Sequence, residues 1–91
     1  MAITLTKKVT SVWADGRPPK SGPGSISDII LPYIETMVAE GKTDGVYYSV
    51  DDTTNYRLWI DQPSAQTYSE FCLNTATEVG RTDLTVTVTD I

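Results

Sequence analysis

Histidine is absent from the sequence, and cysteine occurs once, at Cys72. A single cysteine excludes a disulfide framework within the chain, and the missing histidines exclude a Ser-His-Asp triad, a Cys-His dyad and the common zinc fingers. The chain also has no apolar run of membrane-spanning length and no pattern typical of a signal peptide. We therefore expect a cytoplasmic protein with no membrane partner, no catalytic constellation, no metal site and no cofactor.

Basic residues are few, since 7 lysines and arginines stand against 12 aspartates and glutamates and give a net charge of −5. This balance argues against binding to the phosphate backbone of a nucleic acid or to an anionic lipid surface. The content of 40% hydrophobic and 21% charged residues is typical of soluble globular proteins, and 91 residues suit one domain. We expect residues 1–91 to form a single domain.

The apolar residues follow a period of two in several runs. From Ile3 to Trp13 they occupy odd positions, with mainly threonine and lysine between them, which predicts a strand. Residues 46–50 and 56–60 alternate in the same way, and the turn residues between them predict a hairpin. A last strand is predicted at 84–89. The segment Asp15 to Gly24 holds three prolines and three glycines, which predicts a loop.

Two other segments have helical spacing. In residues 26–38 the apolar positions recur at i, i+3, i+4 and i+7, the stripe of an amphipathic helix. Ser25 and Asp28 are typical of a capping pair at its start. Pro32 falls inside the run and lacks the N–H that a helix needs. This predicts either a kink or a separate first turn that ends at Leu31.

The second helical run covers residues 65–79 and has clear signals at both ends. Asp61 followed by Pro63 is typical of a helix start. Gly41 and Gly80 are expected to stop the two helices, because glycine favours the left-handed conformation just beyond a helix end. The order β-α-β-β-α-β follows. It predicts an α+β fold of the ferredoxin-like type, a four-stranded antiparallel sheet with both helices on one face.

One face of each strand should contact the helices, and we assign the apolar rows to it. The free face then carries threonines together with Tyr47, Arg57 and Trp59. Aromatic residues and arginine dominate protein interfaces, so these three residues predict an interface or ligand surface. A solvated sheet face is the alternative. The assigned inner rows are Ile3, Leu5 and Val9; Val46, Tyr48 and Val50; Tyr56, Leu58 and Ile60; and Leu84, Val86 and Val88.

Four tyrosines, Tyr33, Tyr48, Tyr56 and Tyr68, fall on positions assigned to the inner side. A buried phenol needs a hydrogen-bond partner. Either the four hydroxyls reach the surface, or they line a pocket between helices and sheet and orient a ligand there.

The run DGVYYSVDD at 44–52, followed by NYRLWID at 55–61 and a helix, resembles the dimeric α+β-barrel proteins, a superfamily that includes the antibiotic-biosynthesis monooxygenases. The resemblance covers residues 44–74. It implies a homodimer joined through the two sheets, with small organic molecules bound between sheet and helices. As an activity it implies cofactor-free oxidation of a small molecule.

Two short motifs have simple structural interpretations. Lys20 and Ser21 before a helix look superficially like a phosphate loop, but Pro19 stands where such a loop needs glycine. Cys72 follows an apolar helical position and has no basic residue within one turn to stabilise a thiolate. We expect a surface loop at the first motif and a core residue at the second.

Asp51 and Asp52 are the only acidic residues that are adjacent in the sequence, and Asn55 follows three residues later. Their oxygens could hold calcium, but the spacing of a calcium loop is missing and hairpin turns favour these residue types. Because the other acidic residues are scattered, a mimic of nucleic acid is also a poor interpretation.

Two classes of function stay open. The leading one is a non-enzymatic binding or assembly protein that acts through its free sheet face, with a second copy of the chain or another protein as partner. The alternative is a small-molecule-binding protein, or a cofactor-free monooxygenase-like enzyme, of the dimeric α+β-barrel type.

Overall fold

The computed structural model describes residues 3–19, 22 and 25–91. Lys20, Ser21 and part of the loop predicted at 15–24 therefore lie outside the described residues. The chain order is β1 (Lys7–Trp13), α1 (Ser27–Ala39), β2 (Tyr48–Ser49), β3 (Thr54–Trp59), α2 (Gln62–Glu78) and β4 (Leu84–Asp90).

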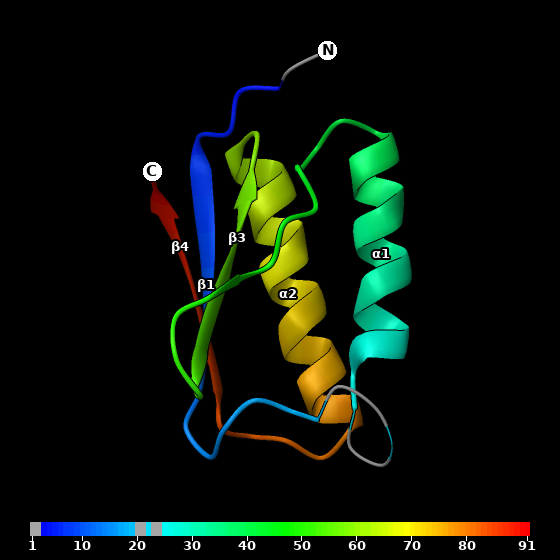
Figure 1. Ribbon diagram of the computed structural model, residues 1–91, viewed down its shortest axis with the longest axis vertical. Coiled ribbons are helices and arrows are strands. Elements are labelled where there is room, and N and C mark those ends of the chain that lie inside the picture. Colours follow the sequence, from blue (N-terminus) through cyan, green and yellow to red (C-terminus); the bar gives the residue numbers. More distant parts are fainter. Residues whose placement is uncertain (1–2, 20–21, 23–24) are drawn as a thin grey trace.

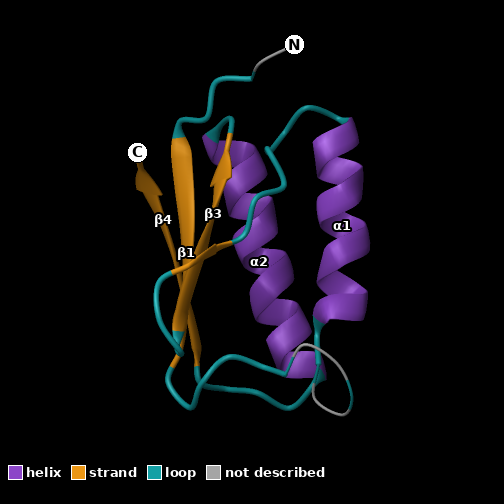
Figure 2. Cartoon of the chain, in the orientation of Figure 1, coloured by secondary structure: helices purple, strands orange, loops and turns teal. Residues whose placement is uncertain are grey.

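The four strands form one antiparallel sheet in the order β2-β3-β1-β4. Both helices lie on the same side of this sheet (Figure 1; Figure 2). The predicted α+β, ferredoxin-like fold is confirmed. Among the described residues, neither helix combines the length and the apolar character needed to cross a membrane.

Helix α2 begins and ends where the sequence predicts. The Asp61 carboxylate accepts a hydrogen bond from the Ser64 N–H at 2.9 Å, and Pro63 lies in the first turn. At the other end Gly80 has a φ of +80°. The Arg81 N–H there donates to the Ala76 carbonyl at 2.8 Å, which satisfies a terminal carbonyl of the helix.

Helix α1 differs from the prediction at its start. Its N-cap is Ile26, with no capping side chain, so the Ser25–Asp28 capping pair is wrong. The Ser25 hydroxyl instead accepts from the N–H of Ser27, two residues on, at 3.3 Å. The helix runs without interruption through Pro32, which excludes a separate first turn. Pro32 is exposed, on the side of α1 that faces away from the core.

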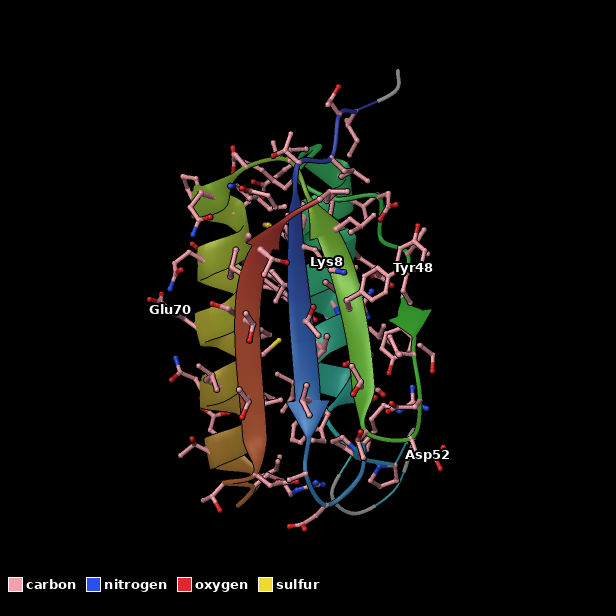
Figure 3. All side chains as sticks on the ribbon, turned by 90° about the vertical axis from the view of Figure 1, so that its left-hand side faces the viewer. Lys8, Tyr48, Asp52 and Glu70 are labelled. Atoms are coloured by element: carbon pink, nitrogen blue, oxygen red, sulfur yellow. The ribbon has the colours of Figure 1, made fainter. Side chains whose placement is uncertain are left out.

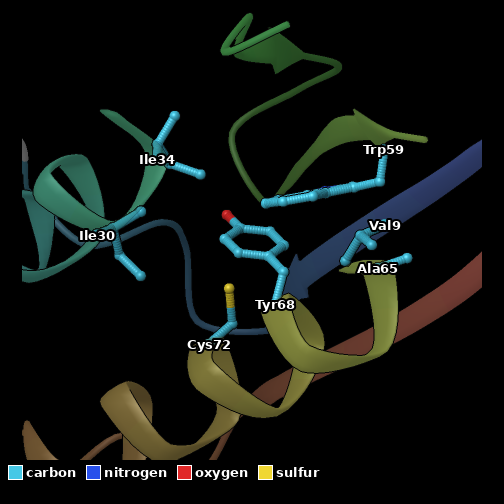
Figure 4. Close-up of a cluster of buried hydrophobic side chains, with 7 residues drawn as sticks. All are labelled: Val9, Ile30, Ile34, Trp59, Ala65, Tyr68 and Cys72. Carbon is cyan, nitrogen blue, oxygen red and sulfur yellow. The ribbon is translucent and has the colours of Figure 1, made fainter. Parts of the chain in front are cut away.

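The core lies between the sheet and the helices (Figure 4). The Trp59 indole packs against the Tyr68 ring with centroids 4.7 Å apart, and Tyr33 stacks on Phe71 at 4.4 Å. These aromatic contacts join β3, α2 and α1. The buried cluster consists of Val9, Ile30, Ile34, Trp59, Ala65, Tyr68 and Cys72.

The inner face of β1 and β4 agrees with the sequence assignment, but that of the hairpin is reversed. Val9 pairs with Val88 on one side and with Arg57 on the other, so all three side chains leave the same face of the sheet. Trp59 is wholly buried on that face. Tyr56 and Leu58, which were assigned inward, point to the other face. The residues of β3 that face the helices are thus Asn55, Arg57 and Trp59.

The face turned away from the helices is called the outer face below, and by register it is rich in threonine. Figure 3 views this face, with Lys8 and Tyr48 labelled. Tyr48 and Tyr56 stack there with their centroids 4.7 Å apart, and the Lys8 ammonium lies 4.9 Å from the Tyr56 ring. By register the outer face comprises Lys8, Thr10, Val12, Tyr48, Thr54, Tyr56, Leu58, Thr85, Thr87 and Thr89.

Candidate functional site

A cleft of about 820 Å³ lies between α1 and the half of the sheet that carries the hairpin. Its floor comes from the inner face of β1, β2 and β3. One wall comes from α1, a second from Tyr68 and Cys72 of α2, and the segment after β1 closes one end. The volume is in the range of small-molecule sites in proteins.

The floor of the cleft is polar. Asn55 pairs with Ser11 on one side and with Ser49 on the other, so three polar side chains form a row across three strands. Arg57 follows two residues after Asn55 on the same face. The Asn55 Oδ1 atom is buried and accepts no hydrogen bond from the described residues. Under α1, polar groups therefore stand where a closed core would have aliphatic side chains.

Arg57 is the buried charge of this floor, with only 5% of its surface exposed. Its Nε donates to the Tyr68 hydroxyl at 3.2 Å, and Nη1 donates to the Gly45 carbonyl at 3.4 Å. Both acceptors are neutral. The salt bridges among the described residues are Lys7–Asp90 and Arg81–Asp83, and neither involves Arg57.

Tyr47 stands at the edge of the cleft between two guanidinium groups. The Arg57 Cζ lies 5.2 Å from the ring centroid, and the Arg17 Cζ lies 6.0 Å from it. Arg17 Nη1 also donates to the Tyr47 hydroxyl at 2.9 Å and to the Ser49 hydroxyl at 2.7 Å. These contacts tie the segment after β1 to the hairpin and place a second cation at the mouth.

The remaining walls are apolar or unreactive. Ile30 and Leu31 of α1 and Trp13 of β1 face the cleft. Burial raises the pKa of Cys72 to about 11, and burial also raises the pKa of Tyr68 well above its usual value. Both groups are therefore protonated at neutral pH and are poor nucleophiles.

Arg81 and Asp83 form a salt bridge beside Trp13, at one end of the cleft. Arg81 donates from Nε and Nη2 to the two Asp83 carboxylate oxygens at 2.8 and 2.7 Å, and its Cζ lies 4.9 Å from the Trp13 ring. Nη2 also donates to the Gly16 carbonyl at 2.6 Å. The hydrogen bonds from Arg81 and from the Asp15 N–H lower the pKa of Asp83 well below its usual value.

The structure separates the three residues predicted to form a surface on the free face. Tyr47 and Arg57 do contact each other, but at the cleft beneath α1. Trp59 is in the core with 0% exposure and cannot belong to a surface. Their assignment to the free face was wrong because the inner face of β3 carries the odd-numbered residues.

The four predicted pocket tyrosines also separate. Tyr68 lines the cleft, and Tyr33 packs beside it with centroids 6.0 Å apart. Tyr48 and Tyr56 lie on the outer face, so the prediction of a pocket position is wrong for these two. The same reversal of the hairpin explains the error.

The possible calcium ligands do not converge. The Asp51 carboxylate accepts hydrogen bonds from the N–H groups of Thr53 and Thr54 and from the Thr53 hydroxyl, and these bonds lower its pKa. Asn55 belongs to β3 and faces the cleft. In the described part of the chain, no three His, Cys, Asp or Glu side chains come close enough to bind a metal.

Sequence reasoning missed Ser11, Arg17 and Asn55 as neighbours in one site. The signal for Asn55 was its spacing, since it shares a strand face with Arg57 and Trp59. For Arg17, which lies in a loop, no local pattern indicates its contact with the hairpin. Comparison of the chain with protein-family models, curated proteins and solved structures finds no match.

Proposed function

We propose that this protein binds a small organic molecule in the cleft between α1 and the sheet. The observation that carries the proposal is the polar floor, in which Ser11, Asn55 and Arg57 occupy inner-face positions beneath an amphipathic helix. Buried polar groups are normally hydrogen-bonded, and an unpaired one costs about 1–3 kcal/mol. The unpaired atom of this floor is Asn55 Oδ1, so a ligand that donates a hydrogen bond to it would remove this cost.

The contrast with the other half of the inner face supports this interpretation. Over β4 the inner positions are Leu84, Val86 and Val88, which pack against the buried cluster. That half is filled by aliphatic side chains, whereas the half beneath α1 holds a cleft of about 820 Å³. One sheet face thus combines a closed core with a site of ligand size.

Binding is favoured over catalysis by the chemistry of the walls. Burial raises the pKa of Cys72 and Tyr68, and the serines that line the cleft have no histidine, lysine or other activating base among the described lining residues. Nucleophilic catalysis usually needs a lowered pKa or an adjacent base. The alternative of a monooxygenase-like enzyme therefore has less support from this site than a binding role.

The test is a panel of small organic molecules, screened by the shift in melting temperature and mapped by amide NMR. A ligand should raise the melting temperature, because it binds only the folded state, and it should shift the amide signals of Ile30, Asn55 and Cys72. Shifts confined to the outer face, or no shift with any compound, would contradict the proposal.

A matched pair of variants sharpens this test. Leu31 on α1 lines the cleft and is 51% exposed, whereas Leu73 on α2 is 41% exposed and lies outside the cleft. Leu31→Trp should fill the cleft and weaken binding by about tenfold or more. Leu73→Trp should leave the affinity unchanged, since it adds the same bulk elsewhere.

A second candidate function, assembly through the outer face, is favoured by one observation. The outer face holds no carboxylate among its register positions, although the chain has 12 acidic residues. It does hold the stacked Tyr48 and Tyr56 and the side chain of Leu58. Interface centres are depleted of charge and enriched in aromatic residues. We therefore also propose that this face, rather than Tyr47, Arg57 and Trp59, joins two copies of the chain.

Light scattering after size exclusion tests the assembly. A mass near twice 10.0 kDa that falls to 10.0 kDa on Leu58→Glu supports a homodimer through the outer face. A matched change on the helix side, Leu73→Glu, should keep the dimer. A monomer at all concentrations would contradict this second candidate and leave the cleft proposal untouched.

A further inference from the structure

We propose that the ligand of the cleft is a small organic monoanion, whose carboxylate pairs with Arg57 and whose apolar body lies against α1; this inference rests on the proposed function. Three properties of the cleft lead to it, namely an uncompensated buried charge, an open hydrogen-bonding edge on that charge and an apolar wall opposite.

The first property is the charge of Arg57. A buried charge is expensive unless it is paired, because burial removes its hydration. Arg57 is 5% exposed and has neutral hydrogen-bond partners among the described residues. The carboxylates nearest to Arg57 in sequence are Asp61 and Asp52; Asp61 caps α2 by accepting from the Ser64 N–H, and Asp52 lines the cleft without forming a salt bridge to Arg57. An anion from outside the chain would supply the missing countercharge.

The overall charge of the cleft sets the charge of that anion. Arg17 and Arg57 bring two positive charges, and Asp52 at the mouth brings one negative charge. The described residues that line the cleft therefore carry one net positive charge, in a chain of net −5. Arg17 is also engaged by Tyr47 and Ser49. This balance fits a monoanion better than a phosphate dianion, which would need further cations.

The second property is the geometry of the guanidinium. Nε is used by the Tyr68 hydroxyl, while the Nη1 bond to the Gly45 carbonyl is long at 3.4 Å. Nη2 makes no hydrogen bond to the described residues. The two Nη atoms can therefore offer parallel N–H groups, the arrangement that a carboxylate accepts with both oxygens. Tyr47 covers the guanidinium from one side at 5.2 Å and would keep water away from the pair.

The third property is the wall that faces this charge. Ile30 and Leu31 of α1 and Ile26 at its N-cap line the cleft, and Trp13 and Pro18 line its end. Hydrocarbon or aromatic surface would be buried against these residues, at about 25 cal/mol per Å². A sugar or other polyhydroxylated body would leave its hydroxyls unpaired there. The ligand should thus resemble an aryl- or alkyl-carboxylic acid, and a body that also carries a donor, such as the indole N–H of indole acetate, could pair with Asn55 Oδ1.

The experiment compares carboxylic acids with their neutral amides on three bodies: phenylpropionate, naphthoate and indole acetate. Titration calorimetry and amide NMR are run on the wild type and on Arg57→Met, which keeps the length and much of the volume of the side chain. At least one acid should bind about tenfold or more tightly than its amide. This preference should disappear in Arg57→Met.

A control variant separates a local pair from a general effect of charge. Lys8→Met removes one positive charge on the outer face, beside Tyr56, and should keep the preference for the acid. Loss of the preference in Lys8→Met as well would show long-range attraction and overturn the pairing with Arg57.

The remaining outcomes separate this inference from the proposed function. Equal binding of acid and amide in the cleft would overturn the carboxylate but leave a ligand-binding protein. Preference for an aryl phosphate over the matching carboxylate would also overturn it. If no acid and no amide at about 1 mM shifts the amides of the cleft, the inference fails, whereas the proposed function fails only if the wider panel of small organic molecules also gives no shift.

Discussion

Val9 of β1 lies directly opposite Arg57 of β3, and both side chains leave the sheet toward the helices. An aliphatic residue and an arginine therefore share the inner face at the centre of the sheet. Val9 belongs to the buried core cluster, whereas Arg57 lines the cleft. This pairing fixes which residues of the hairpin are buried, and Trp59 follows Arg57 on the same side.

Replacement of Trp59 tests the orientation of β3 directly. Trp59→Ala should lower the free energy of unfolding by about 3–5 kcal/mol, because it removes a fully buried indole from the core. Tyr56→Ala, on the outer face of the same strand, should cost much less. Urea unfolding of the two variants measures the difference. A larger loss for Tyr56→Ala would mean that the hairpin faces the other way.

The order of elements was predictable from the sequence because the hydrophobic periods and the turn residues agreed with each other, although the capping signal of α1 was wrong. Asp61 and Pro63 start α2, and Gly80 ends it, as their conformational preferences require. The alternation in β4 was also clear, because threonines fill one face and Leu84, Val86 and Val88 the other. In these elements the local sequence pattern predicts the same secondary structure that the tertiary structure has.

The face of the hairpin was not predictable from alternation alone, since both faces of β3 carry large side chains. Tyr56 and Leu58 stand on one face, and Trp59 with Arg57 on the other. The choice depends on the register with β1 and on the room beneath α1, where a tryptophan fits against Tyr68. A pocket between helices and sheet was among the sequence alternatives, but its floor was missed for the same reason, because Arg57 was assigned to the free face and Asn55 to the hairpin turn.

Gly45 should tolerate a side chain less well than Gly41, although both have nearly the same φ, +75° and +74°. A methyl group at Gly45 would lie 2.7 Å from a methyl of Val38, whereas at Gly41 it would meet nothing within 4 Å. Gly41→Ala should cost about 1–2 kcal/mol from backbone strain alone. Gly45→Ala should cost more.

Thermal or urea unfolding of both glycine variants checks this difference. Adding Val38→Ala to each should recover part of the loss at Gly45 and none at Gly41, because it removes the clashing methyl. Equal costs at the two glycines, unchanged by the second substitution, would show that α1 moves aside freely.

The free energy of unfolding should decrease in acid, partly because the Asp83 carboxylate becomes protonated. Its pKa is lowered in the folded state, mainly by the hydrogen bonds from Arg81, relative to about 3.9 in an unfolded chain. A group of this kind stabilises the fold above its unfolded pKa, and the stabilisation is lost as the pH falls below that value. Asp83→Asn should therefore destabilise the protein at neutral pH, with a smaller difference from wild type in strong acid.

Urea midpoints measured from neutral pH to about pH 2 follow this linkage. Glu35→Gln, on the exposed side of α1, serves as the control substitution. A constant difference between Asp83→Asn and the wild type across the whole range would contradict the role of Asp83 ionisation.

Cys72 should resist alkylation while the protein is folded. Its side chain is buried and its pKa is raised to about 11 by burial, so little thiolate exists near neutral pH. Mass spectrometry after treatment with iodoacetamide should find slow labelling in buffer and rapid labelling in urea. A cleft ligand should slow the labelling in buffer further by stabilising the folded state. Fast labelling of the folded protein would show that the wall formed by α2 opens.

The last prediction concerns the stability of the protein without a ligand. An arginine buried without a carboxylate is a cost to the fold, and apolar replacements of buried charges are often neutral or stabilising by 1–4 kcal/mol in other proteins. Arg57→Met should therefore raise the melting temperature of the free protein, even though it leaves the Tyr68 hydroxyl and the Gly45 carbonyl without their donor. Arg57→Lys keeps the charge and loses the planar group, so it should lower the melting temperature. A matching drop in both variants would mean that Arg57 is held in place for the stability of the fold. A rise in Arg57→Met alone would mean that the charge is retained at the expense of stability, as expected for a residue whose partner arrives with the ligand.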